Sequence, residues 1–277
     1  MSGGVVGREA FSPVKGGGGV VGRVVVTGAG GGIGAALARR FAADGARVIV
    51  NDLNPAAAEA VAAEIGGIAV PGDAANEADT RRLVDTAWAE LGGVDLFCAN
   101  AGILTAGSAD ADDAAWEQAW QVNVMSHVYV ARAVLPRWLE NGGGRLLFTV
   151  SAAGLLTLLG SAPYSVTKHA ALGFAEWLRA TYAHRGITVQ ALCPQGVRTD
   201  MLTDDDSGSA SHAQLAATAM EPAEVAAVVA KAVEGDTFLV LPHPEVAEYY
   251  RRRATDTDRW LGGMNKVQRG FDAAAQL

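Results

Sequence analysis

Residues 27–34 read Thr-Gly-Ala-Gly-Gly-Gly-Ile-Gly and separate a β-branched run at 24–26 from a helix-like run at 33–44. Glycines in such a turn let the backbone bend tightly and approach a pyrophosphate, while the following helix offers free N–H groups and the positive end of its dipole. Simple turns also use glycine, so the signal depends on the strand before the turn and the helix after it. In this setting the stretch predicts a nucleotide-binding turn.

The same alternation of short apolar strands and amphipathic helices continues along the chain. Further strands are expected at residues 47–50, 68–70, 94–98, 145–150, 188–193 and 238–241. Further helices are expected at residues 55–65, 77–91, 113–140, 163–184 and 222–234. Repeated β-α units predict an α/β fold, a Rossmann-like doubly wound parallel sheet with helices on both faces.

The sequence divides into three segments around one domain. Residues 1–21 are rich in glycine and are expected to form a flexible arm, 22–242 form the nucleotide-binding catalytic domain, and 243–277 form a C-terminal extension. A polar stretch at 203–213 is either a mobile lid or a plain loop.

The extension carries more apolar surface than a solvated tail would. Val246, Tyr249 and Tyr250 follow helical spacing, and Trp260 and Met264 flank two glycines expected to be flexible. Burying a large aromatic side chain stabilises by about 2–3 kcal/mol. Two interpretations stay open: the extension packs on the outside of its own domain, or it reaches the substrate pocket.

Composition excludes several classes of partner. The chain of 277 residues has a net charge of -8, which disfavours nucleic acid and anionic lipid. The charged triplets at 204–206 and 251–253 are interpreted as solvated surface. No apolar run is long enough for a membrane span, and the N-terminus lacks the pattern of a signal peptide. Cys98 and Cys193 lie in apolar runs as expected of buried reduced thiols, and the histidines lack metal-ligand spacing, which predicts a cytoplasmic protein without a metal.

Asp52 ends the second predicted strand, 18 residues beyond Gly34. A carboxylate there can accept hydrogen bonds from the ribose hydroxyls of an adenine nucleotide and would repel a 2′-phosphate. Neither Leu53 nor Asn54 offers a compensating cation, so NAD is favoured over NADP. The alternative is that Asp52 caps the helix that starts after Pro55.

Tyr164 and Lys168 lie four residues apart at the start of a predicted helix and share one face. The pKa of a free phenol, about 10, is too high for a general base at neutral pH. A nearby ammonium and a cationic nicotinamide would favour the phenolate, and a shift of about 3 units needs about 4 kcal/mol. Ser151 ends the strand at 145–150, where it could hold a substrate oxygen, although an isolated serine there usually bonds to local backbone.

These motifs together resemble the short-chain dehydrogenase/reductase family, over roughly residues 22–241 and in the expected order. The family's Thr-Gly-x-x-x-Gly-x-Gly matches residues 27–34, and its Asn-Ala-Gly matches residues 100–102. Its helix-borne asparagine matches Asn123, and its serine and Tyr-x-x-x-Lys match Ser151, Tyr164 and Lys168.

The resemblance implies a role for each matched residue. Tyr164 is the acid/base, Ser151 positions the substrate oxygen, Lys168 holds the nicotinamide ribose and lowers the Tyr164 pKa, and Asn123 anchors a water that relays protons. Asp73 would contact the adenine, and Thr199 the carboxamide. The full set expected at the cofactor is Gly28, Gly32, Ile33, Gly34, Asp52, Asp73, Asn100, Ala101, Gly102, Tyr164, Lys168, Pro194, Val197 and Thr199.

Two positions depart from the family pattern. Ala99 replaces the first asparagine of the usual Asn-Asn-Ala-Gly, and Gln195 occupies the usual glycine position after Pro194. The second change puts the local backbone path in question and suggests Gln195 as a substrate-side amide.

The resulting hypothesis is an NAD-dependent oxidoreductase that interconverts a neutral, hydrophobic secondary alcohol and its ketone. The expected apolar lining comes from residues 152–156 with Leu158 and Leu159. The alternatives are a 3-oxoacyl thioester reductase on the same fold and a non-catalytic NAD-binding regulator. A homodimer or homotetramer built on helices 113–140 and 163–178 is also expected, by resemblance and because both helices look too apolar to be covered by one sheet face.

Overall fold

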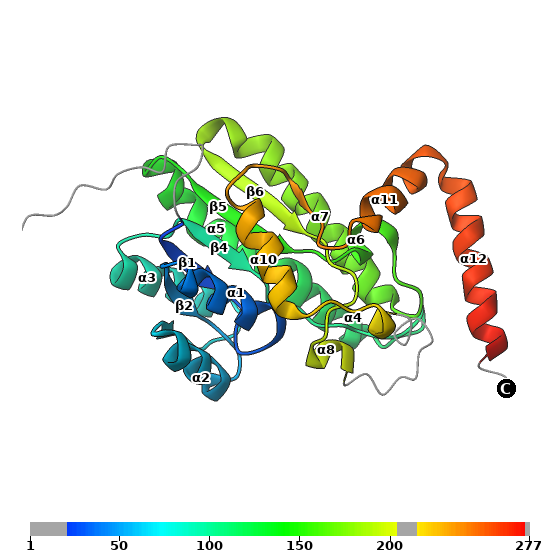
Figure 1. Cartoon of the computed structure of the whole chain (residues 1–277), viewed down its shortest axis with the longest axis horizontal. Helices are drawn as coiled ribbons and strands as arrows, with labels where there is room; N and C mark the ends of the chain where they lie inside the picture. The colour runs from blue at the N-terminus through cyan, green and yellow to red at the C-terminus, as the bar shows by residue number, and fades with distance from the viewer. Residues whose placement is uncertain (1–20, 204–214, 275–277) are drawn as a thin grey trace, which may run out of the picture.

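A seven-stranded parallel sheet forms the centre of the molecule (Figure 1). The computed structural model describes residues 21–203 and 215–274. In the described chain the strand order is β3-β2-β1-β4-β5-β6-β7. The strands are β1 (Arg23–Val26), β2 (Arg47–Val50), β3 (Ile68–Ala69), β4 (Leu96–Ala99), β5 (Gly144–Thr149), β6 (Ile187–Leu192) and β7 (Leu239–Val240). The strands β2 and β3 are added on one side of β1, and β4 then lies on its other side. The ligand crevice of such a sheet is expected at this switch in strand order, beyond the carboxyl ends of β1 and β4.

Helices cover both faces of this sheet and bury two apolar cores. One face carries α1 (Gly32–Ala43), α2 (Pro55–Ile65) and α10 (Pro222–Ala232). The other carries α3 (Glu77–Leu91), α4 (Asp113–Trp120), α5 (Ser126–Glu140) and α7 (Ala162–Tyr182). Strand side chains such as Val25 and Val26 alternate between the two cores, so the strands are buried on both sides as expected of a doubly wound sheet.

The helix expected at 113–140 is interrupted. Residues Gln121–Met125 form a π-helical turn between α4 and α5. Such turns are rare, and many lie at functional sites. Here the turn carries Asn123, one of the expected site residues. Helical periodicity alone does not reveal the change of hydrogen-bond register.

The C-terminal extension forms two helices, α11 (Glu245–Thr255) and α12 (Thr257–Ala274). Gly262 and Gly263 lie inside α12, so the expectation that they form a flexible break is wrong. Figure 1 shows α12 standing apart from the sheet and its flanking helices, joined to them through α11. The expected N-terminal arm, apart from Val21, and the stretch 203–213, apart from Thr203, lie outside the described residues, as does the triplet at 204–206.

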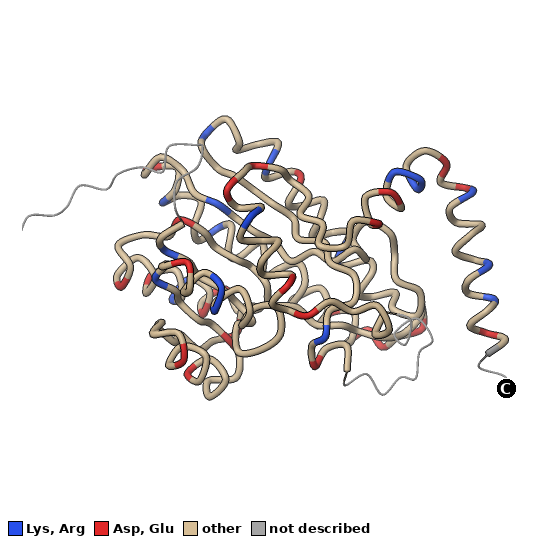
Figure 2. Tube along the Cα trace, viewed as in Figure 1, with Lys and Arg blue, Asp and Glu red and all other residues tan. Residues whose placement is uncertain are grey.

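Lys and Arg positions alternate with Asp and Glu positions along the described chain (Figure 2). Arg251 and Arg252 both pair with Glu248 in α11. Arg253 differs, because it is half-buried and bonds to the body of the domain, so its interpretation as solvated surface is wrong. Among the described helices, none combines the length and apolar character that a membrane span requires.

Candidate active site

A cavity of about 530 Å³ lies at the carboxyl edge of the sheet. It runs from the glycine-rich turn, past the ends of β4 and β5, to the extension. Most of the expected site residues line it, namely Gly28, Gly32, Ile33, Asp52, Asn100, Ala101, Gly102, Ser151, Tyr164, Lys168, Pro194, Gln195, Val197 and Thr199. Parallel strands end at one edge, which brings together residues that are far apart in sequence.

Several glycines of the glycine-rich turn have no room for a side chain. A Cβ on Gly34 would lie 2.0 Å from the carbonyl oxygen of Gly28, and one on Gly30 would lie 2.9 Å from Oδ2 of Asp52. Gly28 also adopts a φ of +60°, which side-chain-bearing residues avoid. The bare backbone at the start of α1 therefore fits the pyrophosphate of a dinucleotide.

Asp52 joins this turn to the end of β2. Its carboxylate accepts hydrogen bonds from the N–H groups of Gly30 and Asn54, each at 2.9 Å. Asn54 caps α2, because its side chain accepts from the N–H groups of Ala56 and Ala57. Asp52 is therefore not the cap of that helix. Its carboxylate lines the cavity, where it fits the role of a ribose acceptor.

Asn100 braces the junction of three strands. Its main-chain N–H donates to Oγ1 of Thr27 at 3.0 Å, and its side-chain Nδ2 donates to the Thr27 carbonyl at 3.1 Å. Its Oδ1 accepts from the Thr149 hydroxyl at 3.0 Å. Asn100 thus fixes the glycine-rich turn after β1 to the end of β5, in addition to lining the cavity.

Tyr164 lies near the start of α7 and is buried. Burial raises the pKa of its phenol above the usual value, and the hydrogen bond with Ser151 acts in the opposite direction. The protein groups alone therefore favour the neutral phenol. The lowering of the Tyr164 pKa that the resemblance implies needs a further positive charge, and an oxidised nicotinamide carries one.

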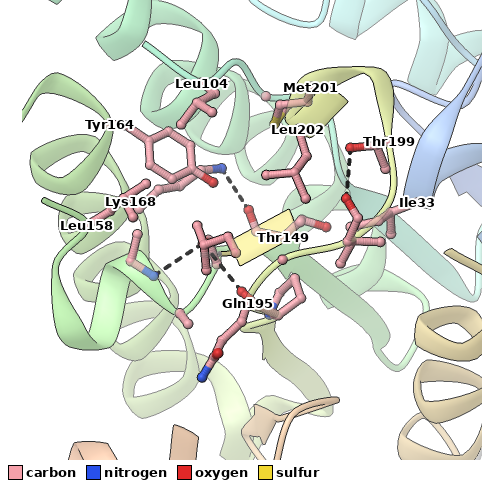
Figure 3. Close-up of a pocket in the computed structure, with 18 of the residues that line it drawn as sticks. Ile33, Leu104, Thr149, Leu158, Tyr164, Lys168, Gln195, Thr199, Met201 and Leu202 are labelled. Atoms are coloured by element: carbon pink, nitrogen blue, oxygen red, sulfur yellow. Dashed lines mark hydrogen bonds between the residues drawn. The ribbon is translucent and has the colours of Figure 1, made fainter. Parts of the chain in front are cut away.

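Lys168 lies one turn further along α7, with its ammonium 5.5 Å from the centre of the Tyr164 ring. Its Nζ donates to the main-chain carbonyl of Thr149 at 3.0 Å (Figure 3). Burial lowers the pKa of Lys168 to about 8, since a buried ammonium loses hydration. A ligand hydroxyl near Nζ would restore part of that lost hydration.

Ser151 follows β5 with a φ of +76°. Its Oγ accepts from the N–H of Ala153 at 3.2 Å and lies 3.5 Å from the Pro194 carbonyl. Backbone strain of this kind costs of order 1–3 kcal/mol and persists only where the surroundings impose it. The strained backbone places the Ser151 hydroxyl beside that of Tyr164.

Asn123 is fully buried and does not line the cavity directly. Its Oδ1 accepts from the N–H of Ile103 at 2.9 Å, while its Nδ2 donates to the Ile103 carbonyl and the Thr167 hydroxyl. A Cβ on Gly102 would lie 3.1 Å from Oδ1 of Asn123 and 3.2 Å from Nζ of Lys168. Asn123 therefore lies directly behind the cavity and ties the segment after β4 to α7.

Gln195 fits its position without a left-handed backbone. Its N–H donates to Nδ1 of His243 at 3.1 Å. Figure 3 shows the Gln195 side chain on the cavity side opposite Tyr164 and pointing away from it. Sequence reasoning missed His243, because it follows β7 and no motif links it to the segment after β6. Burial lowers the pKa of His243, which keeps Nδ1 available as an acceptor.

Some of the residues expected at the site do not line the cavity. Asp73 does not line the cavity, and its Oδ1 accepts from the N–H of Ala75 in a local turn. Leu155 is fully buried in the core, and Gly154 and Leu159 do not line the cavity either, so the expected place of these three residues in the pocket lining is wrong. Leu156 and Leu158 do line the cavity. Burial lowers the pKa of His127 to about 3, and the charge of Lys168 acts in the same direction, so this histidine is neutral.

Comparison with known proteins decides the family. The model of the family described as short chain dehydrogenase matches residues 22–210. This chain is a short-chain dehydrogenase. The 1-deoxy-11-beta-hydroxypentalenate dehydrogenase of Streptomyces exfoliatus is 35% identical over 248 residues, which cover 85% of this chain and 88% of that protein.

Two solved short-chain dehydrogenases share the fold. One, from Burkholderia phymatum in complex with NAD, has a TM-score of 0.80 and 26% identity, over 86% of this dehydrogenase and 95% of that chain. The other is a 7 alpha-hydroxysteroid dehydrogenase in complex with NADH and 7-oxo glycochenodeoxycholic acid. It has a TM-score of 0.72 and 27% identity, over 80% of this dehydrogenase and 93% of that chain. The expected family, the Rossmann-like fold and the class of oxidoreductase acting on CH–OH groups are confirmed.

Proposed function

We propose that this short-chain dehydrogenase transfers hydride between NAD(H) and a neutral, apolar secondary alcohol or ketone. The observation that carries the proposal is the placement of Ser151, Tyr164 and Lys168 in one cavity with the glycine-rich turn. Around these polar groups the walls are apolar, with Leu104 and Leu202 among them. Such walls stabilise an apolar skeleton and would leave a charged group desolvated without a partner.

NAD is the cofactor that the residues fit. The Asp52 carboxylate can accept from ribose hydroxyls and would repel a 2′-phosphate. The NAD and NADH complexes of the two solved relatives agree with this choice. When bound, NAD supplies the hydride acceptor, and NADH the hydride donor.

Tyr164 carries the proton in both directions. In oxidation its phenolate takes the proton of the substrate hydroxyl as the hydride leaves the carbinol carbon, and in reduction its phenol returns that proton to the carbonyl oxygen. The Ser151 hydroxyl donates a hydrogen bond to the same substrate oxygen. Lys168 favours the phenolate electrostatically and offers its ammonium to the ribose, while Asn123 holds the backbone behind the site.

Two further properties belong to this proposal. The exposed Val166 and Trp177 of α7 support self-association through that helix into a homodimer or homotetramer. The two cysteines are buried and free, which agrees with a reducing cytoplasmic compartment.

A panel of secondary alcohols with NAD and with NADP, followed by NADH absorbance, tests the proposal. Turnover of neutral apolar alcohols with NAD is expected, with weaker turnover of carboxylated or polyhydroxylated ones. Preferential reduction of 3-oxoacyl thioesters with NADPH would favour the thioester reductase. NAD binding without turnover of any substrate would favour a non-catalytic regulator.

A further inference from the structure

The extension formed by α11 and α12, here called the C-terminal arm (Glu245–Ala274), meets the domain over a narrow strip. In α12 the half-buried described residues are Trp260, Met264, Gln268 and Phe271, whereas the other described side chains are exposed. Their spacing places them on one helix face. Broad packing against the domain therefore does not explain the position of α12. The half-buried face formed by these four residues, here called the covered face, needs another explanation.

The covered face borders the same cavity that contains Tyr164. Trp260 and Met264 of α12 and Tyr249 of α11 all line it. The rings of Tyr249 and Trp260 lie 6.2 Å apart at an angle of 40°, so the two helices present a joint aromatic surface. Nε1 of Trp260 is shielded from solvent and has no acceptor among the described residues. An interior site for a ligand fits these side chains better than a solvated face does.

Arg253 fixes this arm to the catalytic helix α7. Its Nη1 donates to the carbonyl of Leu155 and lies 3.2 Å from Nε2 of His169. His169 places its Nδ1 2.8 Å from the carbonyl of Ser165, so Nδ1 carries the proton and Nε2 accepts. Since Ser165 adjoins Tyr164, this chain of bonds sets the arm relative to the acid/base.

We propose that the C-terminal arm is the distal wall of the substrate site and selects secondary alcohols with a bulky, apolar, multi-ring skeleton. The inference rests on the proposed function, because it requires the reactive hydroxyl to lie at Tyr164. Leu156 and Leu158 line the same cavity as Tyr164, and we expect a small alcohol held there to contact walls of this kind without reaching the arm. A larger skeleton extends to Trp260 and Met264, where the indole adds apolar area and the thioether adapts to its shape.

Truncation of the arm's cavity-facing side chains tests the proposal. KM and kcat are measured with NAD for cyclohexanol and for a neutral 3-hydroxysteroid, and binding of the corresponding 3-oxosteroid to the enzyme–NADH complex is measured by fluorescence titration. Trp260→Ala is expected to raise the steroid KM and the oxosteroid Kd about tenfold, and the cyclohexanol KM less than twofold. Met264→Ala should change them in the same direction by a smaller factor.

Leu261→Ala and Val267→Ala are matched controls in the same helix, because both side chains are exposed and neither lines the cavity. Thermal unfolding of all four variants reports any general damage to the fold. The proposal would be overturned if Trp260→Ala changed the KM of both alcohols equally or left steroid binding unchanged. It would also be overturned if the wild-type enzyme oxidised cyclohexanol but not the steroid. Failure to oxidise either alcohol would instead count against the proposed function itself.

Discussion

The carboxylate of Asp52 accepts a hydrogen bond from the main-chain N–H of Gly30 across 2.9 Å. The end of β2 and the glycine-rich turn after β1 are thereby joined into one unit. A dinucleotide that bridges them would place its adenosine ribose at Asp52 and its pyrophosphate at the start of α1. The acidic group therefore shapes the turn as well as the choice of cofactor.

Replacing Asp52 with alanine should narrow the preference for NAD. The ribose loses a charged acceptor, which lowers kcat/KM for NAD by about 10- to 100-fold, and the repulsion of a 2′-phosphate disappears. Steady-state kinetics with both cofactors measure the change. Asp52→Asn is the comparison variant, since it removes the charge and keeps one acceptor oxygen for the N–H of Gly30, although its NH2 group can no longer accept from Asn54. A wild-type preference for NADP would refute the cofactor assignment.

Tyr164→Phe should abolish most turnover and leave cofactor binding largely intact. The hydroxyl moves the proton, and general acid/base catalysis contributes about 10²- to 10⁴-fold. Stopped assays of kcat and a fluorescence titration with NADH separate the two effects. Lys231→Ala, at an exposed position of α10 that does not line the cavity, should change neither quantity. Turnover by the Phe variant within tenfold of the wild type would contradict the mechanism.

Trp177→Arg should weaken self-association. Trp177 is 55% exposed on α7, on the helix expected to meet a second copy, and a charge there would have to be desolvated in the interface. Light scattering at micromolar concentration should give a dimer or tetramer for the wild type and smaller species for the variant. Leu53→Arg, at an exposed position after β2, is the control and should leave the mass unchanged. A monomeric wild type would contradict the assembly.

Much of the sheet was predictable because its signals are local. The β-branched runs at 24–26 and 47–50 are strands, and the glycine-rich turn lies between β1 and α1 as expected. The order of Ser151, Tyr164 and Lys168 along α/β units also places them at one edge without knowledge of side-chain geometry.

What the sequence could not predict depends on long-range contacts. The partnership of Gln195 with His243 joins segments 48 residues apart in sequence. The bond from Arg253 to Leu155 turns an apparently solvated arginine into an anchor. The sign of the pKa shift of Tyr164 depends on its burial, which the Tyr-x-x-x-Lys spacing does not reveal.

Burial of the Lys168 ammonium destabilises the folded protein without cofactor. Its pKa is lowered to about 8 in the folded protein, against 10.5 for a free lysine. Below about pH 8 the Lys168 side chain is charged in both the folded and the unfolded protein, and burial of that charge destabilises the folded protein. Between the two pKa values the unfolded chain binds more protons, so rising pH favours the folded state.

Lys168→Met, which keeps the length of the side chain and removes the charge, should therefore be more stable than the wild type without cofactor at neutral pH. The gain is at most about 3 kcal/mol and should shrink as the pH rises from 8 towards about 9.5, because the wild-type lysine then loses its proton on folding. Urea unfolding across this range measures the difference between the two proteins. Lys231→Met, at an exposed lysine of α10, is the matched control and should show neither the gain nor its pH dependence. A Lys168→Met protein that is less stable than the wild type at neutral pH, or whose advantage does not vary with pH, would show that burial does not govern this ammonium.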